Sequence, residues 1–144
     1  MGEREESIVG AVVSGWSGEE FGEAEITRLV DSLSEDIRYQ VYAWERPIVG
    51  RDAVREELLR QAGMGFGGVR SEISTMASVD QTVFMERTDS MTIGRKPLTI
   101  HVAAVVEVNA EGKISAWREY YDSREISVKL GTDAGTSGSR GYDT

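Results

Sequence analysis

The sequence predicts an α+β fold in which helices come first along the chain and an antiparallel meander of strands follows. Apolar residues recur at helical spacing in residues 8–33 and 51–62, whereas most segments from residue 69 onward alternate between apolar and polar side chains. The chain has 144 residues, of which 40% are hydrophobic, enough to bury one core. We therefore expect a single domain over residues 1–130. Residues 131–144 contain four glycines and almost no apolar side chains, so we expect this tail to be disordered.

Three helices are expected in the first half of the chain, with one strand between the second and the third. The first two follow the apolar spacing of Ile8–Trp16 and Ile26–Leu33, and the third runs from about Arg51 to Ala62. The strand covers Asp36–Trp44, where the segment IRYQVYAW alternates and is rich in aromatic and β-branched residues. The third helix has an expected inner face with Val54, Leu58 and Ala62, and an expected outer face with Arg55, Glu56 and Arg60.

The second half of the chain is expected to form strands. A glycine-rich run at residues 63–68 ends the third helix. Because it follows a helix and lacks the GK[ST] ending of a phosphate-binding loop, we interpret it as a connection to the first of these strands. Turns are expected around Gly94 and at Asn109–Gly112. The expected strands are Val69–Ser78, Gln81–Ile93, Leu98–Val108 and Lys113–Ser123.

Composition excludes several classes of function. A net charge of −9 and a pI of about 4.7 argue against binding to nucleic acid or to an anionic membrane surface. The chain has no cysteine and one histidine, His101, which excludes disulfides, thiolate zinc sites and multi-histidine metal sites. It lacks both a signal-peptide pattern and an apolar run of the roughly 20 residues that span a membrane. We expect a soluble cytoplasmic protein, without metal or cofactor, whose chemistry rests on carboxylates, arginines and tyrosines.

Strand alternation places charged side chains among apolar neighbours. Arg87 and Asp89 share one face of residues 81–93, and Glu119 shares a face with two aromatic residues of the last strand. If the apolar faces point inward, the interior receives these three residues and Tyr39. A buried arginine with two carboxylates is costly unless the groups satisfy one another, which makes the cluster a candidate functional site. An ordinary exposed ion pair on a sheet face is the alternative. The apolar candidates for a pocket lining on the inward faces are Val41, Met85, Met91, Ile100, Val102, Trp117 and Tyr121.

Four segments of the sequence resemble the limonene-1,2-epoxide hydrolase family, which belongs to the SnoaL-like and nuclear-transport-factor-like superfamily. They are EDIRYQ at Glu35–Gln40, GRDAV at Gly50–Val54, ERTD at Glu86–Asp89 and EGKISAWREYYDSRE at Glu111–Glu125. The resemblance covers roughly residues 6–127. It implies a cystatin-like fold, a curved and mostly antiparallel, mixed sheet of about five or six strands whose helices enclose a conical pocket. It also implies a homodimer that adds water to an epoxide and forms a vicinal diol in one step, without a cofactor or a covalent intermediate.

The resemblance also implies roles for individual residues. Arg87 and Asp89 match the family's R-x-D motif, so that Asp89 would protonate the epoxide oxygen and Arg87 would bridge two carboxyl groups. Glu119 falls where the family has the aspartate that deprotonates water, and Tyr39 matches a tyrosine that helps to hold this water. The chain departs from the family in two places, with glutamate for aspartate at Glu119 and Val41 in place of a second water-holding residue, an asparagine.

Three classes of function remain open from the sequence. The first is an epoxide hydrolase for a small or medium apolar epoxide, because opening an epoxide with water needs a base and an acid at the same pH. The second is a different acid–base enzyme on the same scaffold, such as an epoxide-opening cyclase, a polyketide cyclase or an isomerase. The third is a non-catalytic ligand-binding module. The joint presence of Arg87, Asp89 and Glu119 favours an enzyme.

Other conspicuous residues are expected to be structural. We expect His101, on the strand face opposite Ile100, to contact a helix or a partner subunit. Asp122 has the wrong strand parity to join Glu119 and should face away from it. Trp16 and Trp44 are expected to pack in the core.

Overall fold

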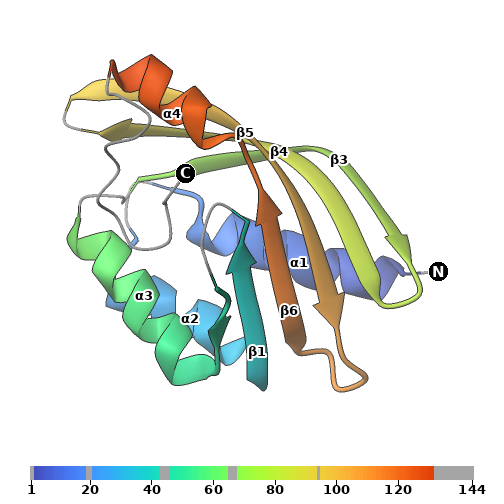
Figure 1. Ribbon diagram of the computed structural model, residues 1–144. Helices are drawn as coiled ribbons and strands as arrows, with labels where there is room; N and C mark the ends of the chain where they lie inside the picture. Colours follow the sequence, from blue (N-terminus) through green and yellow to red (C-terminus); the bar gives the residue numbers. More distant parts are fainter. Residues whose placement is uncertain (1, 19–20, 43–45, 65–67, 94, 132–144) are drawn as a thin grey trace.

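The computed structural model describes residues 2–18, 21–42, 46–64, 68–93 and 95–131 (Figure 1). Trp44 and the expected disordered tail after residue 131 lie outside these ranges. The described residues form ten helices and strands. In chain order they are α1 (Glu3–Trp16), α2 (Glu23–Asp31), β1 (Leu33–Val41), β2 (Ile48–Val49), α3 (Arg51–Gly63), β3 (Arg70–Val79), β4 (Thr82–Ile93), β5 (Lys96–Val108), β6 (Ile114–Tyr120) and α4 (Ser123–Leu130).

The strands form a mixed six-stranded sheet in the order β2-β1-β6-β5-β4-β3. Strands β1 and β6 pair in parallel, and every other pair is antiparallel. Figure 1 shows that the long strands curve, that α1, α2 and α3 lie on one side of the sheet, and that α4 lies near the end where β5 begins. The expected α+β class and mostly antiparallel sheet are confirmed.

The core lies between the inner face of the sheet and the first three helices. Strand β5 shows the reason most clearly, because its burial alternates from Leu98 to Val108 with the period of two that places every second side chain on the inner face. The helices contribute buried apolar residues at helical spacing, such as Val9 and Val13 on α1 and Ile26 and Val30 on α2. These four helix residues belong to one cluster of packed side chains with Ala104, Val106 and Val108 of β5, whereas Leu98, Ile100 and Val102 form a second, smaller cluster.

The largest departure from the expected elements is α4. The last strand was expected to run to Ser123, but it ends at Tyr120 and a helix follows. Asp122 begins this helix as its N-cap, since its Oδ1 accepts a hydrogen bond of 2.9 Å from the backbone N–H of Arg124. Gly131 ends it in the left-handed conformation, with a φ of 73°. Two β-branched residues inside the helix, Ile126 and Val128, obscure its helical pattern in the sequence.

Two further expectations need correction. Leu33, expected to end the second helix, begins β1 after α2 ends at Asp31, and β1 in turn ends at Val41. Arg60, expected on the outer face of α3, contacts the cavity described below, while Glu57 of the same helix is 2% exposed. Glu57 accepts hydrogen bonds from Arg60 at 3.0 and 2.6 Å and from Gln61 at 2.9 Å. A carboxylate that is neutralised in this way can lie on an inner face together with the arginine that neutralises it, which is why hydrophobic periodicity misplaced Arg60.

Candidate active site

A cavity of about 470 Å³ lies between the helices and the inner face of the sheet. The four residues with expected catalytic roles, Tyr39, Arg87, Asp89 and Glu119, all contact it. Most of its wall is apolar. Six of the seven residues expected to line a pocket do so: Val41, Met91, Ile100, Val102, Trp117 and Tyr121.

Met85 is the exception. It is 3% exposed and belongs to the main core cluster, and it is not part of the cavity wall. Inward orientation does not by itself place a residue at the cavity. Met85 lies two residues closer than Arg87 to the turn between β3 and β4, and α1 contacts β4.

The centre of the site is an arginine between two carboxylates. Strand β5 lies between β4 and β6, with Val102 opposite Arg87 and Ala104 opposite Glu119. Because Ala104 has a small side chain, the guanidinium of Arg87 can extend over β5 towards Glu119. Its Nη2 lies 2.5 Å from Oε2 of Glu119 and 3.1 Å from Oδ2 of Asp89, and its Nε lies 2.9 Å from Oδ1 of Asp89. One guanidinium therefore binds both carboxylates at once.

All three charged side chains are removed from water. Arg87 is 4% exposed, Asp89 6% and Glu119 8%. Burial opposes the charge on Arg87, but the negative charges of Glu119 and Asp89 outweigh this effect and raise the pKa of the guanidinium above its ordinary value. Arg87 therefore stays charged at any pH at which the protein is folded. With two carboxyls and one fixed cation, one added proton makes the cluster neutral.

Glu119 has a second hydrogen-bond partner. The indole Nε1 of Trp117, two residues earlier on the same face of β6, donates to its Oε2 at 3.0 Å. Val41 lies beside it on β1, directly opposite Glu119 in the parallel pairing, and Tyr39 lies opposite Trp117. The carboxylate of Glu119 is thus fixed in position next to an apolar side chain.

Sequence reasoning missed two residues of the site, Trp16 and Ser71. The hydroxyl of Ser71 on β3 lies 2.7 Å from Oδ1 of Asp89, and the indole Nε1 of Trp16 donates to the same hydroxyl at 2.7 Å. The ring of Trp16 also contacts Arg87, whose Cζ is 5.1 Å from the ring centroid. Only the pairing of β3 with β4 reveals Ser71, which lies directly opposite Asp89.

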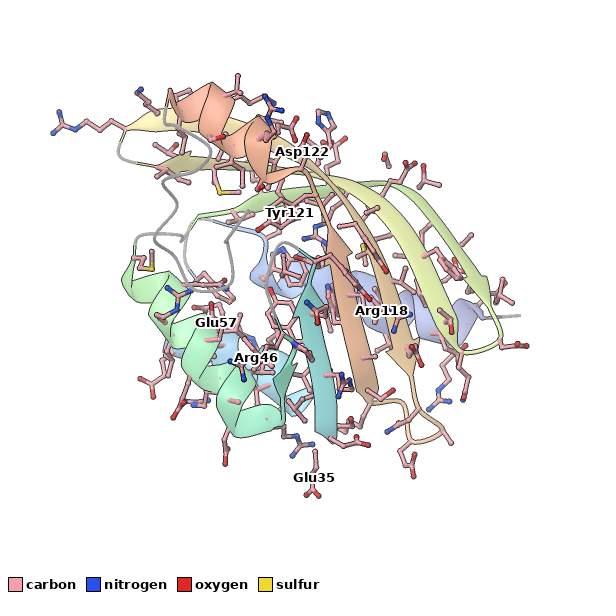
Figure 2. The ribbon with its side chains drawn as sticks, in the orientation of Figure 1. Glu35, Arg46, Glu57, Arg118, Tyr121 and Asp122 are labelled. Atoms are coloured by element: carbon pink, nitrogen blue, oxygen red, sulfur yellow. The ribbon has the colours of Figure 1, made fainter. Side chains whose placement is uncertain are left out.

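Two other residues lie where the sequence suggested. The Nδ1 of His101 is 2.9 Å from Oε2 of Glu125 on α4, so the expected helix contact is confirmed. Figure 2 shows Asp122 at the start of α4, and it does not contact the cavity, whereas Tyr121 does.

Two further features concern metal sites and membrane-spanning helices. In the ranges that the structure describes, no group of three or more histidine, aspartate or glutamate side chains is placed to hold a metal ion. None of the described helices combines the length and the apolar character needed to cross a membrane.

Comparisons with known structures identify the fold. An LEH-like epoxide hydrolase from M. tuberculosis is 24% identical over 88% of this chain and 89% of that chain, with a TM-score of 0.72. A hypothetical protein with a ketosteroid isomerase-like fold from Catenulispora acidiphila is 20% identical over 88% and 93%, with a TM-score of 0.74. SalBIII, an epoxide hydrolase/cyclase-like enzyme of pyran ring formation in salinomycin, is 18% identical over 87% and 97%, with a TM-score of 0.68. At these identities the likeness shows the fold alone.

Sequence comparison identifies the family. A search of curated proteins finds no match. The family model of the limonene-1,2-epoxide hydrolase catalytic domain matches residues 20–130, which include all the carboxylates and the arginine of the site. This match spans most of the chain, and the protein therefore belongs to the limonene-1,2-epoxide hydrolase family.

Proposed function

We propose that this protein is an epoxide hydrolase that adds water to a small or medium apolar epoxide and gives a vicinal diol in one step. The observation that carries the proposal is the buried cluster of Asp89, Arg87 and Glu119 at the wall of an apolar cavity. An apolar wall suits an uncharged, carbon-rich substrate. A similar structure, from M. tuberculosis, is that of an LEH-like epoxide hydrolase.

In this proposal Asp89 is the general acid. Its protonated carboxyl donates to the epoxide oxygen as the C–O bond breaks, because an unprotonated alkoxide is a poor leaving group. Glu119 is the general base, which takes a proton from the attacking water while the water oxygen bonds to carbon. Tyr39 holds that water. The two protons balance, since the acid loses one and the base gains one.

Arg87 keeps the two carboxyl groups in different protonation states. Two carboxylates near one cation share a single proton, and their different hydrogen-bond partners favour one arrangement of that proton. Each proton transfer by a positioned group contributes typically about 10²–10⁴-fold to the rate. No covalent intermediate is required.

An epoxide-opening cyclase is the second candidate, and Val41 is the residue that favours it. This side chain is 2% exposed, contacts the cavity and lies opposite Glu119, where a valine cannot hold a water molecule. A hydroxyl group of the substrate would then replace water as the nucleophile. SalBIII, an epoxide hydrolase/cyclase-like enzyme, has a similar fold.

The test is diol formation from a panel of cyclic and aryl epoxides in ¹⁸O-labelled water. A hydrolase incorporates one solvent oxygen into each diol, whereas a cyclase gives a cyclic ether without it. Asp89→Asn should lower turnover by about 10²–10⁴-fold. The matched control is Asp80→Asn, the same change at an exposed turn position where φ is 54° and asparagine is well tolerated.

Failure of the proposal would be plain. It is wrong if no epoxide in the panel reacts, or if Asp89→Asn and Asp80→Asn have equal activity while circular dichroism shows both folded.

A homodimer and a cytoplasmic location also remain proposals. Light scattering after size-exclusion chromatography tests the first of these.

A further inference from the structure

The side chains of Trp16 and Ser71 approach the proposed general acid from outside the cluster of charges. Ser71 on β3 and Asp89 on β4 lie directly opposite each other in the antiparallel pairing, so their side chains share the inner face. The distance from the Ser71 hydroxyl to Oδ1 of Asp89 is 2.7 Å, and that from the Trp16 Nε1 to the same hydroxyl is also 2.7 Å. An indole N–H can only donate. It therefore occupies a lone pair of Ser71 and favours donation of the hydroxyl proton to Asp89.

Residues 16–18, at and just after the end of α1, are attached to residues 69–71, at the start of β3, by three hydrogen bonds, which fix this geometry. Besides the Trp16 hydrogen bond, the backbone N–H of Ser71 donates to Oγ of Ser17 at 3.0 Å, and the N–H of Gly18 donates to the carbonyl of Val69 at 3.0 Å. The Trp16 ring meanwhile packs against the guanidinium of Arg87 and lies 5.4 Å from the ring of Trp117. Because the indole ring of Trp16 is held on both sides, its N–H points towards the hydroxyl of Ser71.

The two oxygens of Asp89 are therefore not equivalent. Oδ1 accepts from Nε of Arg87 at 2.9 Å and from Ser71 at 2.7 Å, whereas Oδ2 accepts from Nη2 of Arg87 at 3.1 Å. Oδ1 has two donors directed at it and is the less favourable place for a proton. When Asp89 is protonated, the proton belongs on Oδ2.

We propose that Trp16 and Ser71 form a positioning pair that holds the acid proton of Asp89 on Oδ2 and stabilises the carboxylate left after that proton is transferred. This inference rests on the proposed function. The hydrogen bond from Ser71 is a neutral one before proton transfer and a charge-assisted one afterwards, and charge-assisted bonds are roughly twice as strong. An interaction that strengthens as the reaction proceeds raises kcat and leaves KM almost unchanged.

The kinetic test compares Ser71→Ala with Ser71→Thr, which keeps the hydroxyl, and with Ser74→Ala at an exposed position of the same strand. Ser71→Ala should lower kcat by about tenfold, the difference between a neutral and a charge-assisted hydrogen bond, with little change in KM. Ser71→Thr should restore most of the rate, and Ser74→Ala should equal the wild type. Trp16→Phe should lower kcat less, in the same direction.

A pH profile separates this role from a structural one. The charged and titratable side chains that share the cavity with Asp89 are Arg87 on its own strand, Glu119 on β6, Tyr39 on β1, Arg60 on α3 and Tyr121 after β6. All of them remain in Ser71→Ala. Loss of the Ser71 bond favours the protonated acid, so the alkaline limb of kcat/KM should move to higher pH. A variant that merely packs badly would lose rate without moving that limb.

A second measurement needs no substrate. In a proton–nitrogen NMR spectrum, the indole N–H signal of Trp16 is identified by its absence in Trp16→Phe. It should shift as the carboxyl pair titrates, lose most of that shift in Ser71→Ala, and keep it in Ser71→Thr. The positioning pair is disproved if the shift is the same with and without the Ser71 hydroxyl. If no epoxide reacts with the wild type, the proposed function fails while this measurement still decides whether the hydrogen-bonded chain exists.

Discussion

The carboxylate of Glu119 has a defined position, although its side chain is one methylene group longer than that of an aspartate. The family resemblance places an aspartate here, and a glutamate carboxylate reaches farther from the strand. Two donors constrain it, because Oε2 lies 2.5 Å from Nη2 of Arg87 and 3.0 Å from Nε1 of Trp117. Both donors engage the same oxygen. In the proposed reaction the other oxygen, Oε1, which neither of these two donors engages, accepts the proton from water.

We predict that Glu119→Gln lowers kcat/KM by about 10²–10⁴-fold, because the amide occupies the same space but cannot take a proton. The measurement is steady-state diol formation. Glu86→Gln is the matched control, since Glu86 is exposed on the opposite face of the strand that carries Arg87. Comparable activity of the two variants would exclude Glu119 as the base.

The residues of the site differ in how far they could be predicted. Arg87, Asp89 and Glu119 could be inferred because a strand repeats every two residues and the pattern identifies its inner face. Ser71 is a small polar residue in a strand of alternating exposure, and nothing in its surroundings along the chain distinguishes it. The role of Ser71 depends on the register of β3 against β4. The role of Trp16 depends on where α1 ends. Neither the register nor the end of the helix follows from the local pattern of apolar and polar residues.

Among the elements, α4 protects the part of β5 that β6 leaves uncovered. The pairing of β5 with β6 begins at Ala103, so the backbone of residues 99–101 lacks a strand on that side. Side chains of α4 take its place. Glu125 accepts from the N–H of His101 at 3.0 Å, and Lys129 donates to the carbonyl of Thr99 at 2.5 Å. An adjoining face of α4 packs Ile126 and Leu130 against the inner face of β5. An exposed strand edge is thereby covered.

We predict that Glu125→Gln loosens α4 at neutral pH and has less effect in acid. The backbone N–H of His101 first, and then its side chain and Lys129, lower the pKa of Glu125 to about 2 against the partial desolvation that would raise it. A depressed pKa means that the carboxylate stabilises the folded state above its ordinary pKa. This stabilisation is lost as the pH falls from there towards about 2.

The measurement is hydrogen exchange of α4 amides in wild type and Glu125→Gln at several pH values, compared at equal intrinsic exchange rates. Protection should differ most near pH 7 and converge as Glu125 becomes protonated. Glu111→Gln, in the exposed turn between β5 and β6, is the control and should match the wild type. A pH-independent difference would show that the charge of Glu125 does not hold the helix.

For the molecule as a whole, the long curved strands and the helices enclose more space than the side chains fill. The sequence predicted the class, the order of most elements and the inward faces, because these depend on periodicity alone. It did not predict α4, whose Ile126 and Leu130 close one end of the cavity against Leu98 and Ile100. The extent of the cavity depends on how far each helix lies from the sheet, and that distance is a property of packing rather than of pattern.

The end of the cavity beneath α4 should determine the size of substrate, and Leu98 tests this. Val102 is the residue of β5 that lies opposite Arg87. Leu98 lies on the same inner face four residues earlier, roughly 13 Å from Val102 along the strand. We predict that Leu98→Phe lowers kcat/KM for a bulky aryl epoxide by about 10-fold or more relative to a small aliphatic one, since a pocket distinguishes substrates by the space it denies them. Activity on the small epoxide should persist because the charged cluster is untouched.

The control for this prediction is Thr99→Phe, which adds the same bulk to the exposed face of the same strand. Overpacking at Leu98, which is 2% exposed, is expected to reduce the free energy of unfolding by about 1–3 kcal/mol, so urea denaturation must show both variants folded under assay conditions. If the small and the bulky epoxide lose activity equally in Leu98→Phe, the substrate does not reach α4. The cavity beyond the charged cluster would then be a packing defect of the fold, and the part of it that selects the substrate would lie between α3 and β1, where Arg60, Tyr39 and Val41 form the wall.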